Sequence, residues 1–285
     1  MSRAPIDPAI FPSLTEVAGS LARSVGAVIR SLRDAGVDVA ATKSSAVDVV
    51  TAADREAERL LAAGLAELRP DDGVLGEEGA SRAGTSGITW VVDPIDGTVN
   101  YLYQLPAYAV SVAATVADDS PAGARAGNTA DGRRAVAGAV YLPVTDELFT
   151  AFEGGGARLN GEPLTGPAET ELGTALVATG FGYTVERRTE QAEVVRRLIP
   201  QVRDIRRMGS AATDLCLLAA GRLDAYYERG LQPWDYAAGA LIAREAGALL
   251  LGRDDALPGE PMLIAAAPML ARRLQAEIAA AYAEL

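Results

Sequence analysis

The sequence predicts an α/β protein of mixed α+β type, and three observations support this fold class. Two segments near the N-terminus carry apolar residues at helical spacing. The middle of the chain contains short apolar runs between turn residues, which indicate strands. From residue 176 onward, such runs alternate with helical segments, which is typical of an α/β unit.

Two amphipathic helices are predicted at the start of the chain. Residues 13–33 form the first, with Ser13 as N-cap and Glu16 as its capping-box partner. The second helix follows Thr51, and its inner stripe consists of Ala57, Leu60, Leu61, Leu65 and Leu68. The polar stretch 42–45 between them includes Lys43 and is expected to be a mobile loop.

The middle of the chain is predicted to be rich in strands. Residues 90–92 make a short buried strand, which Pro94 should terminate because proline lacks a backbone N–H. Residues 108–116 and 135–142 read as two further strands, and the segment 118–134 between them as a solvated hairpin loop. Asn160-Gly161 is typical of a two-residue hairpin turn.

The second half alternates between the two kinds of element. We expect strands over 176–179, 202–205, 223–227, 248–251 and 262–265, and helices over 188–199, over 210–221, from Trp234 and from Pro268. The chain is therefore divided into an N-terminal α+β half, residues 1–150, and a C-terminal α/β half, residues 151–285.

Composition excludes several kinds of chemistry. The net charge is −12, so binding to nucleic acid or to an anionic membrane is not expected, and an anionic substrate needs local positive charge. The chain has no histidine, which excludes Ser-His triads and His-ligated zinc. Cys216 is the only cysteine and lies in an apolar run, where a buried role is expected. Without a signal peptide or an apolar run of membrane-spanning length, a cytoplasmic location is expected.

The segment Asp93-Pro94-Ile95-Asp96-Gly97-Thr98 carries the first sign of chemistry. Pro94 favours an extended backbone at Asp93, so both aspartates are predicted at the carboxyl end of a strand. Gly97 then permits a tight turn into a short helix whose N–H groups would face an anion. Two carboxylates there would repel phosphate unless a divalent cation lay between them, and hard oxygen ligands indicate Mg²⁺. Taken alone, the segment is more simply a solvated Asx turn.

Two other segments place carboxylates in comparable positions. Glu77 follows a short apolar strand, and Asp235 stands at the start of a helix of small residues. Taken alone, Glu77 is most simply a solvated side chain and Asp235 a helix N-cap. The joint presence of Glu77, Asp93, Asp96 and Asp235 favours a metal site.

These segments resemble the motifs of the inositol monophosphatase family, which belongs to the lithium-sensitive, Mg²⁺-dependent phosphatases of sugars and nucleotides. The likeness is strongest to the bacterial inositol-1-phosphatases. Five motifs occur in the order of the family and span residues 43–247. They comprise residues 48–54, 76–78, 90–100, 209–212 and 225–239.

The resemblance implies a metal site and a catalytic apparatus. Two or three Mg²⁺ ions would be held by Glu77, Asp93, the Ile95 carbonyl, Asp96 and Asp235. Thr98, oriented by Asp54, would activate the attacking water together with Glu77. With neither histidine nor a reactive cysteine, direct in-line attack by water is the simplest route to hydrolysis.

The resemblance also implies how substrate is held. Phosphate would bind to the N–H groups of Gly97 and Thr98, and polyol hydroxyls to Glu228 and to the backbone of residues 209–211. Lys43 would sit on the mobile loop that closes the site. The full set of expected substrate contacts is Ile95, Asp96, Gly97, Thr98, Gly209, Ser210, Ala211, Glu228 and Asp235.

The expected activity is therefore Mg²⁺-dependent hydrolysis of myo-inositol 1-phosphate or a similar monoester. A fructose-1,6-bisphosphatase or a dual-activity enzyme is the nearest alternative, because Arg206, Arg207 and Arg229 lie near the sugar-facing segment. Phosphatases of nucleotide bisphosphates or histidinol phosphate are further alternatives. The non-enzymatic alternatives are a regulatory protein of the transcription machinery and an unrelated structural α/β protein. The resemblance also implies a layered αβαβα sandwich, a homodimer and inhibition by Li⁺.

Overall fold

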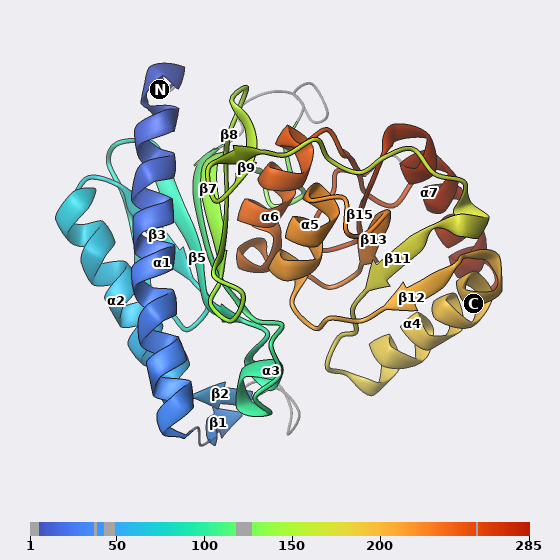
Figure 1. Ribbon diagram of the computed structural model, residues 1–285, viewed down its shortest axis with the longest axis horizontal. Helices are drawn as coiled ribbons and strands as arrows, with labels where there is room; N and C mark the ends of the chain where they lie inside the picture. Colours follow the sequence, from blue (N-terminus) through green and yellow to red (C-terminus); the bar gives the residue numbers. More distant parts are fainter. Residues whose placement is uncertain (1–5, 37–38, 43–48, 118–126, 255) are drawn as a thin grey trace.

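The computed structural model describes residues 6–36, 39–42, 49–117, 127–254 and 256–285. Five layers follow one another along the longest axis of the molecule (Figure 1). They are, in order, helices α1 (Phe11–Ala35) and α2 (Ala52–Leu68), an eight-stranded sheet, helices α5 (Ala211–Ala219) and α6 (Pro233–Glu245), a five-stranded sheet, and helices α4 (Val185–Leu198) and α7 (Pro268–Ala283). The predicted α/β class and the αβαβα arrangement are confirmed.

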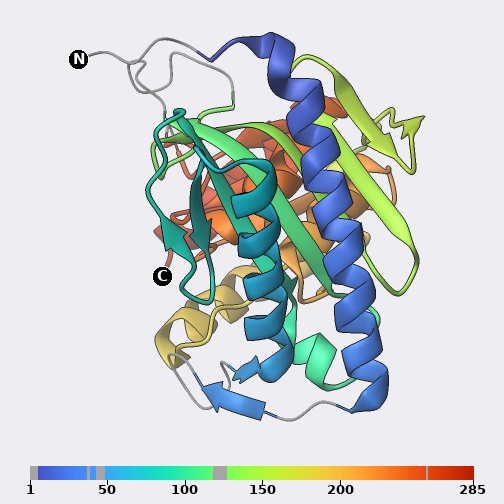
Figure 2. The same cartoon turned by 90° about the vertical axis from the view of Figure 1, so that its left-hand side faces the viewer.

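Helices α1 and α2 run side by side over the outer face of the first sheet (Figure 2). The predicted N-cap of α1 is wrong. The helix begins at Phe11, because Pro12 fits the first turn, and the Ser13 hydroxyl instead donates to the Ile10 carbonyl at 2.8 Å. Helix α2 begins as predicted after Thr51, which forms a capping box with Asp54.

The first sheet has the order β10-β9-β8-β7-β6-β5-β3-β4, and only its β3–β5 pair is parallel. A separate two-stranded ribbon consists of β1 (Val39–Thr42) and β2 (Val49–Thr51). The strands of the first sheet are β3 (Gly73–Gly76), β4 (Ser81–Arg82), β5 (Ile88–Asp96), β6 (Ala109–Ala117), β7 (Arg133–Leu142), β8 (Glu147–Phe152), β9 (Gly156–Leu159) and β10 (Glu162–Pro163).

The prediction that Pro94 terminates its strand is wrong. Strand β5 continues to Asp96, and its pairing with β6 shifts between Asp93, opposite Ser111, and Asp96, opposite Ala109. One extra residue on β5 therefore forms a bulge, which accommodates the missing N–H of Pro94. The bulge re-aims the backbone between the two aspartates just before the short helix α3 (Thr98–Leu102).

The two predicted turns have different outcomes. Asn160-Gly161 joins β9 to β10 with φ of 50° and 89°, as a two-residue hairpin turn requires, so this prediction is confirmed. In the segment 118–134, residues 118–126 lie outside the described part of the chain. The rest is not simply solvated, because Asn128 and Arg134 are buried and face each other across a β-bridge.

The second sheet has the order β12-β11-β13-β15-β14. Its strands are β11 (Leu176–Thr179), β12 (Asp204–Arg206), β13 (Ala225–Glu228), β14 (Leu249–Leu251) and β15 (Leu263–Ala266). The first three are parallel, and β15 pairs antiparallel with both β13 and β14. The chain passes from one sheet to the other between Pro163 and Leu176, whereas the division near residue 150 remains a prediction.

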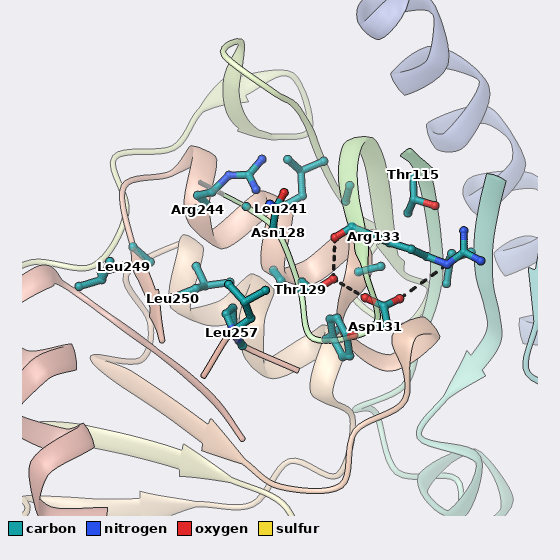
Figure 3. A pocket seen from close by; sticks show the side chains of 18 residues that line it. Thr115, Asn128, Thr129, Asp131, Arg133, Leu241, Arg244, Leu249, Leu250 and Leu257 are labelled. Atoms are coloured by element: carbon teal, nitrogen blue, oxygen red, sulfur yellow. Dashed lines mark hydrogen bonds and ion pairs between the residues drawn. The ribbon is translucent and has the colours of Figure 1, made fainter. Parts of the chain in front are cut away.

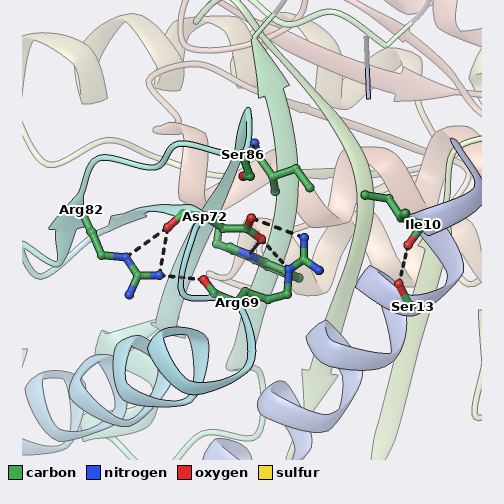
Figure 4. A network of polar contacts seen from close by, with 8 residues as sticks. Ile10, Ser13, Arg69, Asp72, Arg82 and Ser86 are labelled. Atoms are coloured by element: carbon green, nitrogen blue, oxygen red, sulfur yellow. Dashed lines mark hydrogen bonds and ion pairs between the residues drawn. The ribbon is translucent and has the colours of Figure 1, made fainter. Parts of the chain in front are cut away.

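A buried ion pair fixes the start of the two parallel strands β3 and β5 (Figure 4). Asp72 is 1% exposed and accepts from Arg69 Nε at 2.7 Å and from the indole Nε1 of Trp90 at 2.9 Å. The guanidinium of Arg82 also donates to the Asp72 carbonyl at 2.9 Å. These bonds hold Trp90 in the sheet three residues before Asp93, so they anchor the strand that carries the site.

Helices on both faces of each sheet bury its side chains in four apolar clusters. Helices α5 and α6 lie between the two sheets, and the start of each lies near the carboxyl end of β5. Among the helices of the described residues, none combines the length and apolarity needed to cross a bilayer.

Candidate metal centre and active-site cavity

Three aspartates from two elements meet at the carboxyl end of β5, an interior strand of the first sheet. Asp93 and Asp96 flank the bulge of β5, and Asp235 lies in the first turn of α6. One carboxylate oxygen from each lies within 4.8 Å of the others. Asp93 and Asp96 are buried and Asp235 is half-buried, so the group is largely shielded from solvent where β5 meets α6.

Each aspartate is fixed by backbone or hydroxyl donors. Asp96 Oδ2 accepts from the Ser210 hydroxyl and from the Ala212 N–H, both at 2.7 Å, which links β5 to the start of α5. The Asp235 carboxylate accepts from the Gln232 N–H at 2.7 Å. Gln232 is therefore the N-cap of α6 and Asp235 its capping-box partner, so the simple interpretation of Asp235 as an N-cap is wrong.

The three carboxylates repel one another, and a bound cation would relieve this repulsion. Burial raises the pKa of Asp93 and Asp235 well above the usual range of an aspartate, and repulsion from Glu77 and Asp96 raises the pKa of both further. Burial likewise raises the pKa of Asp96 to about 7, against the effect of its Ser210 and Ala212 bonds. None of the ion pairs among the described residues includes any of the three. Oxygen ligands without a basic partner fit a hard divalent cation.

Glu77 faces the same cavity from the end of β3, the parallel neighbour of β5. It lies outside the group of three, although it is close enough to raise their pKa. A buried carboxylate on α2 holds its loop: Glu58 Oε2 accepts from the Glu78 N–H and Oε1 from the Ala80 N–H, both at 2.7 Å. A Cβ at Gly76 would lie 2.2 Å from Glu58 Oε2, so only glycine permits this approach.

Thr98 joins the cavity to the capping box of α2. Its hydroxyl lies 3.0 Å from Asp54 Oδ1 and 3.1 Å from the Ile95 carbonyl, and it can donate to either. Asp54 Oδ2 accepts from the Thr51 N–H at 2.8 Å and from the Thr51 hydroxyl. Burial raises the pKa of Asp54, which is fully buried behind Thr98. The carboxylate can therefore orient the Thr98 hydroxyl without entering the cavity itself.

The cavity at this site has a volume of about 370 Å³. The turn at Gly97 lines this cavity, and the φ of Gly97, 96°, lies in the left-handed region that glycine favours. The start of α5 forms another wall, and Asn100 ties it to α3 by donating to the Met208 carbonyl at 2.7 Å and to the Ala107 carbonyl at 2.6 Å. The predicted residues that line it are Glu77, Asp93, Ile95, Asp96, Gly97, Thr98, Gly209, Ser210, Ala211, Glu228 and Asp235.

Glu228 enters the cavity from the end of β13. Its Oε2 accepts from the Tyr226 hydroxyl at 2.8 Å, and a Cβ at Gly180 would lie 1.9 Å from the same oxygen. Burial raises the pKa of Glu228 to about 7, while the Tyr226 bond and the charge of Arg207 oppose this shift. Arg187 and Arg207 also line the cavity, so its walls carry positive as well as negative charge.

All but two of the predicted site residues therefore line this one cavity. Asp54 lies behind Thr98, and Lys43 lies outside the described residues. Sequence reasoning missed Glu58, Asn100 and Gly180. Glu58 could have been found, because it stands three residues before Leu61 and seven before Leu65 on the inner face of α2. The other two depend on contacts between distant segments, which leave no local pattern.

The chain is similar in sequence and in structure to several known proteins. A model of the inositol monophosphatase family matches residues 12–285. The inositol-1-monophosphatase SuhB of Mycobacterium tuberculosis is 45% identical over 284 residues, covering 93% of both chains. The Nus factor SuhB of Escherichia coli is 37% identical and covers 83% of this chain and 84% of its own. The crystal structure of extragenic suppressor protein suhB from Bartonella henselae has a TM-score of 0.83 at 32% identity, covering 93% of this chain and 98% of its own.

Proposed function

The chain belongs to the inositol monophosphatase family, and we propose that it hydrolyses a phosphate monoester of a small polyol, most readily myo-inositol 1-phosphate. The observation that best supports this proposal is the convergence of Asp93, Asp96 and Asp235 in a cavity that Thr98, whose hydroxyl donates to Asp54 behind it, also lines. Similarity to proteins named inositol-1-monophosphatase supports the substrate class.

The cation we propose is Mg²⁺, with two or three ions held by Glu77, Asp93, the Ile95 carbonyl, Asp96 and Asp235. Bound there, Mg²⁺ supplies positive charge to the phosphoryl group and lowers the pKa of the attacking water. Li⁺ is expected to inhibit, because a monovalent ion beside Asp96 and Asp235 would supply too little charge for turnover.

We assign activation of the attacking water to Thr98 and Glu77. The Thr98 hydroxyl would accept a hydrogen bond from the water while it donates a hydrogen bond to Asp54, 3.0 Å away, and keeps its own proton. Glu77 would take the proton that the water loses, since it lines the same cavity and its loop is held by Glu58. Thr51 would keep Asp54 in place through the capping box of α2.

Substrate would lie between the two halves of the fold. The N–H groups of Gly97 and Thr98 would hold phosphate in the turn after β5. Glu228 would accept hydrogen bonds from polyol hydroxyls, together with the backbone of residues 209–211. Lys43 would approach from the segment before β2 to close the site.

A sugar bisphosphate is the second candidate substrate, and the position of two arginines supports it. Arg207 and Arg187 line the same cavity as the aspartates. Arg187 pairs with the exposed Glu260 at 3.1 Å, an arrangement that a second phosphate group could replace. Fructose-1,6-bisphosphatase activity would use these arginines, whereas a monoester would not need both.

The name Nus factor, carried by the Escherichia coli relative, motivates a non-enzymatic candidate, a regulator of the transcription machinery. A net charge of −12 argues that such a regulator would contact protein rather than nucleic acid. We also propose the homodimer and the cytoplasmic location that the family resemblance implies. Light scattering of the purified protein checks the first and cell fractionation the second.

The proposed function is tested by measuring phosphate release from inositol 1-phosphate, fructose 1,6-bisphosphate, a 3′,5′-nucleotide bisphosphate and histidinol phosphate. Each substrate is assayed with Mg²⁺ and with EDTA. We expect fastest turnover of inositol 1-phosphate with Mg²⁺ and none with EDTA. No release from any of the four with Mg²⁺ would favour the non-enzymatic candidate.

A further inference from the structure

A second cavity, with a volume of about 400 Å³, lies between α6, the first sheet and β14 (Figure 3). No described residue lines both this cavity and the active-site cavity. Its walls are mostly apolar and include Val91, Leu241, Leu249, Leu250 and Leu257. A cavity of this size and lining is in the range that takes a small organic molecule.

The cavity contains a cation whose charge is weakly compensated. Arg244, from the last turn of α6, lines the cavity and its side chain is 19% exposed. Its Nη2 is buried and donates no hydrogen bond to any described residue. Glu245 Oε1 lies 3.6 Å away, beyond hydrogen-bond length, while Glu245 Oε2 accepts from the Gly154 and Gly156 N–H groups at 3.0 and 3.2 Å. Burial lowers the pKa of Arg244, although arginine stays charged at neutral pH.

Four other polar side chains of the cavity have partners within the protein. The Thr115 hydroxyl donates to the Thr89 carbonyl at 2.7 Å. Thr129 donates to the Arg133 carbonyl at 2.9 Å, and Arg133 pairs with Asp131 at 3.7 Å. Figure 3 shows these last contacts gathered around Asp131, away from Arg244. Arg244 therefore differs from them in carrying a buried donor without an acceptor.

We propose that this cavity is a ligand site for a small carboxylate with an apolar body. The carboxylate would accept from the Arg244 guanidinium, whose planar fork matches two carboxylate oxygens. The apolar body would lie against the leucines of α6, β14 and the following turn. A strongly hydrated phosphate ester fits less well, because most of the walls are apolar and the other donors there, Thr115, Thr129 and Arg133, already have partners in the protein.

The site shares two elements with the metal centre. Val91 lines it two residues before Asp93 on β5, and Tyr236 lines it directly after Asp235 on α6. The proposal nevertheless does not depend on the proposed function, because binding can be measured without turnover.

The test is calorimetric titration of the whole protein, in EDTA, with hexanoate, octanoate and 3-phenylpropanoate. Octanamide, which keeps the apolar body but lacks the charge, is the matched control ligand. We expect one molecule of carboxylate per chain, bound at least about tenfold more tightly than the amide, the effect of a charge-assisted hydrogen bond. No saturable binding by any of the three up to about 10 mM would overturn the proposal.

Two arginine variants locate the binding. Arg244→Met keeps the apolar stem and should weaken octanoate binding at least about tenfold, to the level of octanamide. Arg207→Met removes an arginine of the active-site cavity and should leave octanoate binding unchanged. The opposite pattern would assign the carboxylate to the active site and overturn the proposal. If Arg244→Met does not fold, Arg207→Met still decides: unchanged preference for octanoate over octanamide supports the proposal, and its loss overturns it.

Discussion

Glu58 Oε2 lies 2.7 Å from the backbone nitrogen of Glu78, so a buried carboxylate of α2 holds the loop that follows β3. Its other oxygen accepts from the Ala80 N–H at the same distance. Glu77 lies within this loop and faces the metal centre. The position of Glu77 is therefore set by a helix that contributes no residue to the walls of the cavity.

The first prediction concerns Glu58→Gln. One oxygen becomes an amide that faces an N–H donor, so one of the two loop bonds is lost. We expect the Mg²⁺-dependent rate to fall about ten- to a hundredfold, since a hydrogen bond to a charged group is worth about 1.5–3 kcal/mol. Glu56→Gln is the matched control, because Glu56 lies on the same helix but is paired with Arg59 at the surface. Equal rates in both variants would show that Glu58 does not position Glu77.

The second prediction concerns the metal. Asp96→Asn keeps an oxygen for the Ser210 and Ala212 bonds but removes a charge, so it should fold and lose at least about a hundredfold in rate. Mg²⁺ should raise the melting temperature of the wild type by relieving repulsion among the aspartates, and much less in the variant. The measurements are phosphate release and thermal melting with Mg²⁺ or EDTA. Full activity in EDTA would contradict the proposed mechanism.

The third prediction concerns pH in the absence of metal. The pKa of Asp96 is about 7 in the folded protein and near 3.8 in the unfolded chain, so the folded state binds the additional proton between these values. Its contribution to stability is complete below pH 4 and is lost as pH rises through 7, at about 1.4 kcal/mol per pH unit.

Melting in EDTA from pH 5 to pH 8 checks this sign. The wild type should lose stability relative to Asp96→Asn as the pH rises, and Mg²⁺ should stabilise the wild type more at pH 8 than at pH 5. A constant difference between the two proteins across this range would show that Asp96 does not titrate there.

The sequence predicted those parts of the fold and site that depend on local patterns. Helix α2 begins after Thr51 and Asn160-Gly161 forms the hairpin turn between β9 and β10, both as predicted, because short-range bonds decide both. The five-layer arrangement came from the family resemblance. Ser13 and Pro94 were predicted wrongly, since Pro12 moves the start of α1 and pairing with β6 carries β5 past the proline. Both errors arise where a neighbour outweighs the local preference of one residue.

The missing parts of the site depend on tertiary contacts. Asn100 bonds to the Met208 carbonyl across 108 positions, and Gly180 is needed because Glu228 passes next to it. The helical spacing of Glu58 shows that it lies on the inner face of α2. Its role in holding the loop after β3 becomes clear only from its hydrogen bonds to that loop.

The last prediction separates recognition of the polyol from phosphatase chemistry. Glu228 reaches the cavity from the end of β13, and its Oε2 already accepts from the Tyr226 hydroxyl. In Glu228→Gln the charge is lost while the side chain keeps its size. If Glu228 binds inositol hydroxyls, kcat/KM for inositol 1-phosphate should fall about ten- to a hundredfold.

A simple aryl phosphate lacks those hydroxyls, so the variant should hydrolyse it almost as fast as the wild type. Glu190→Gln is the matched control, because Glu190 is 44% exposed, pairs with Arg229 and does not line the cavity. Both substrates should be unaffected by that change. An equal fall for both substrates in Glu228→Gln would instead place Glu228 in the catalytic apparatus, since a residue that only recognises the polyol cannot slow the reaction of a substrate without one.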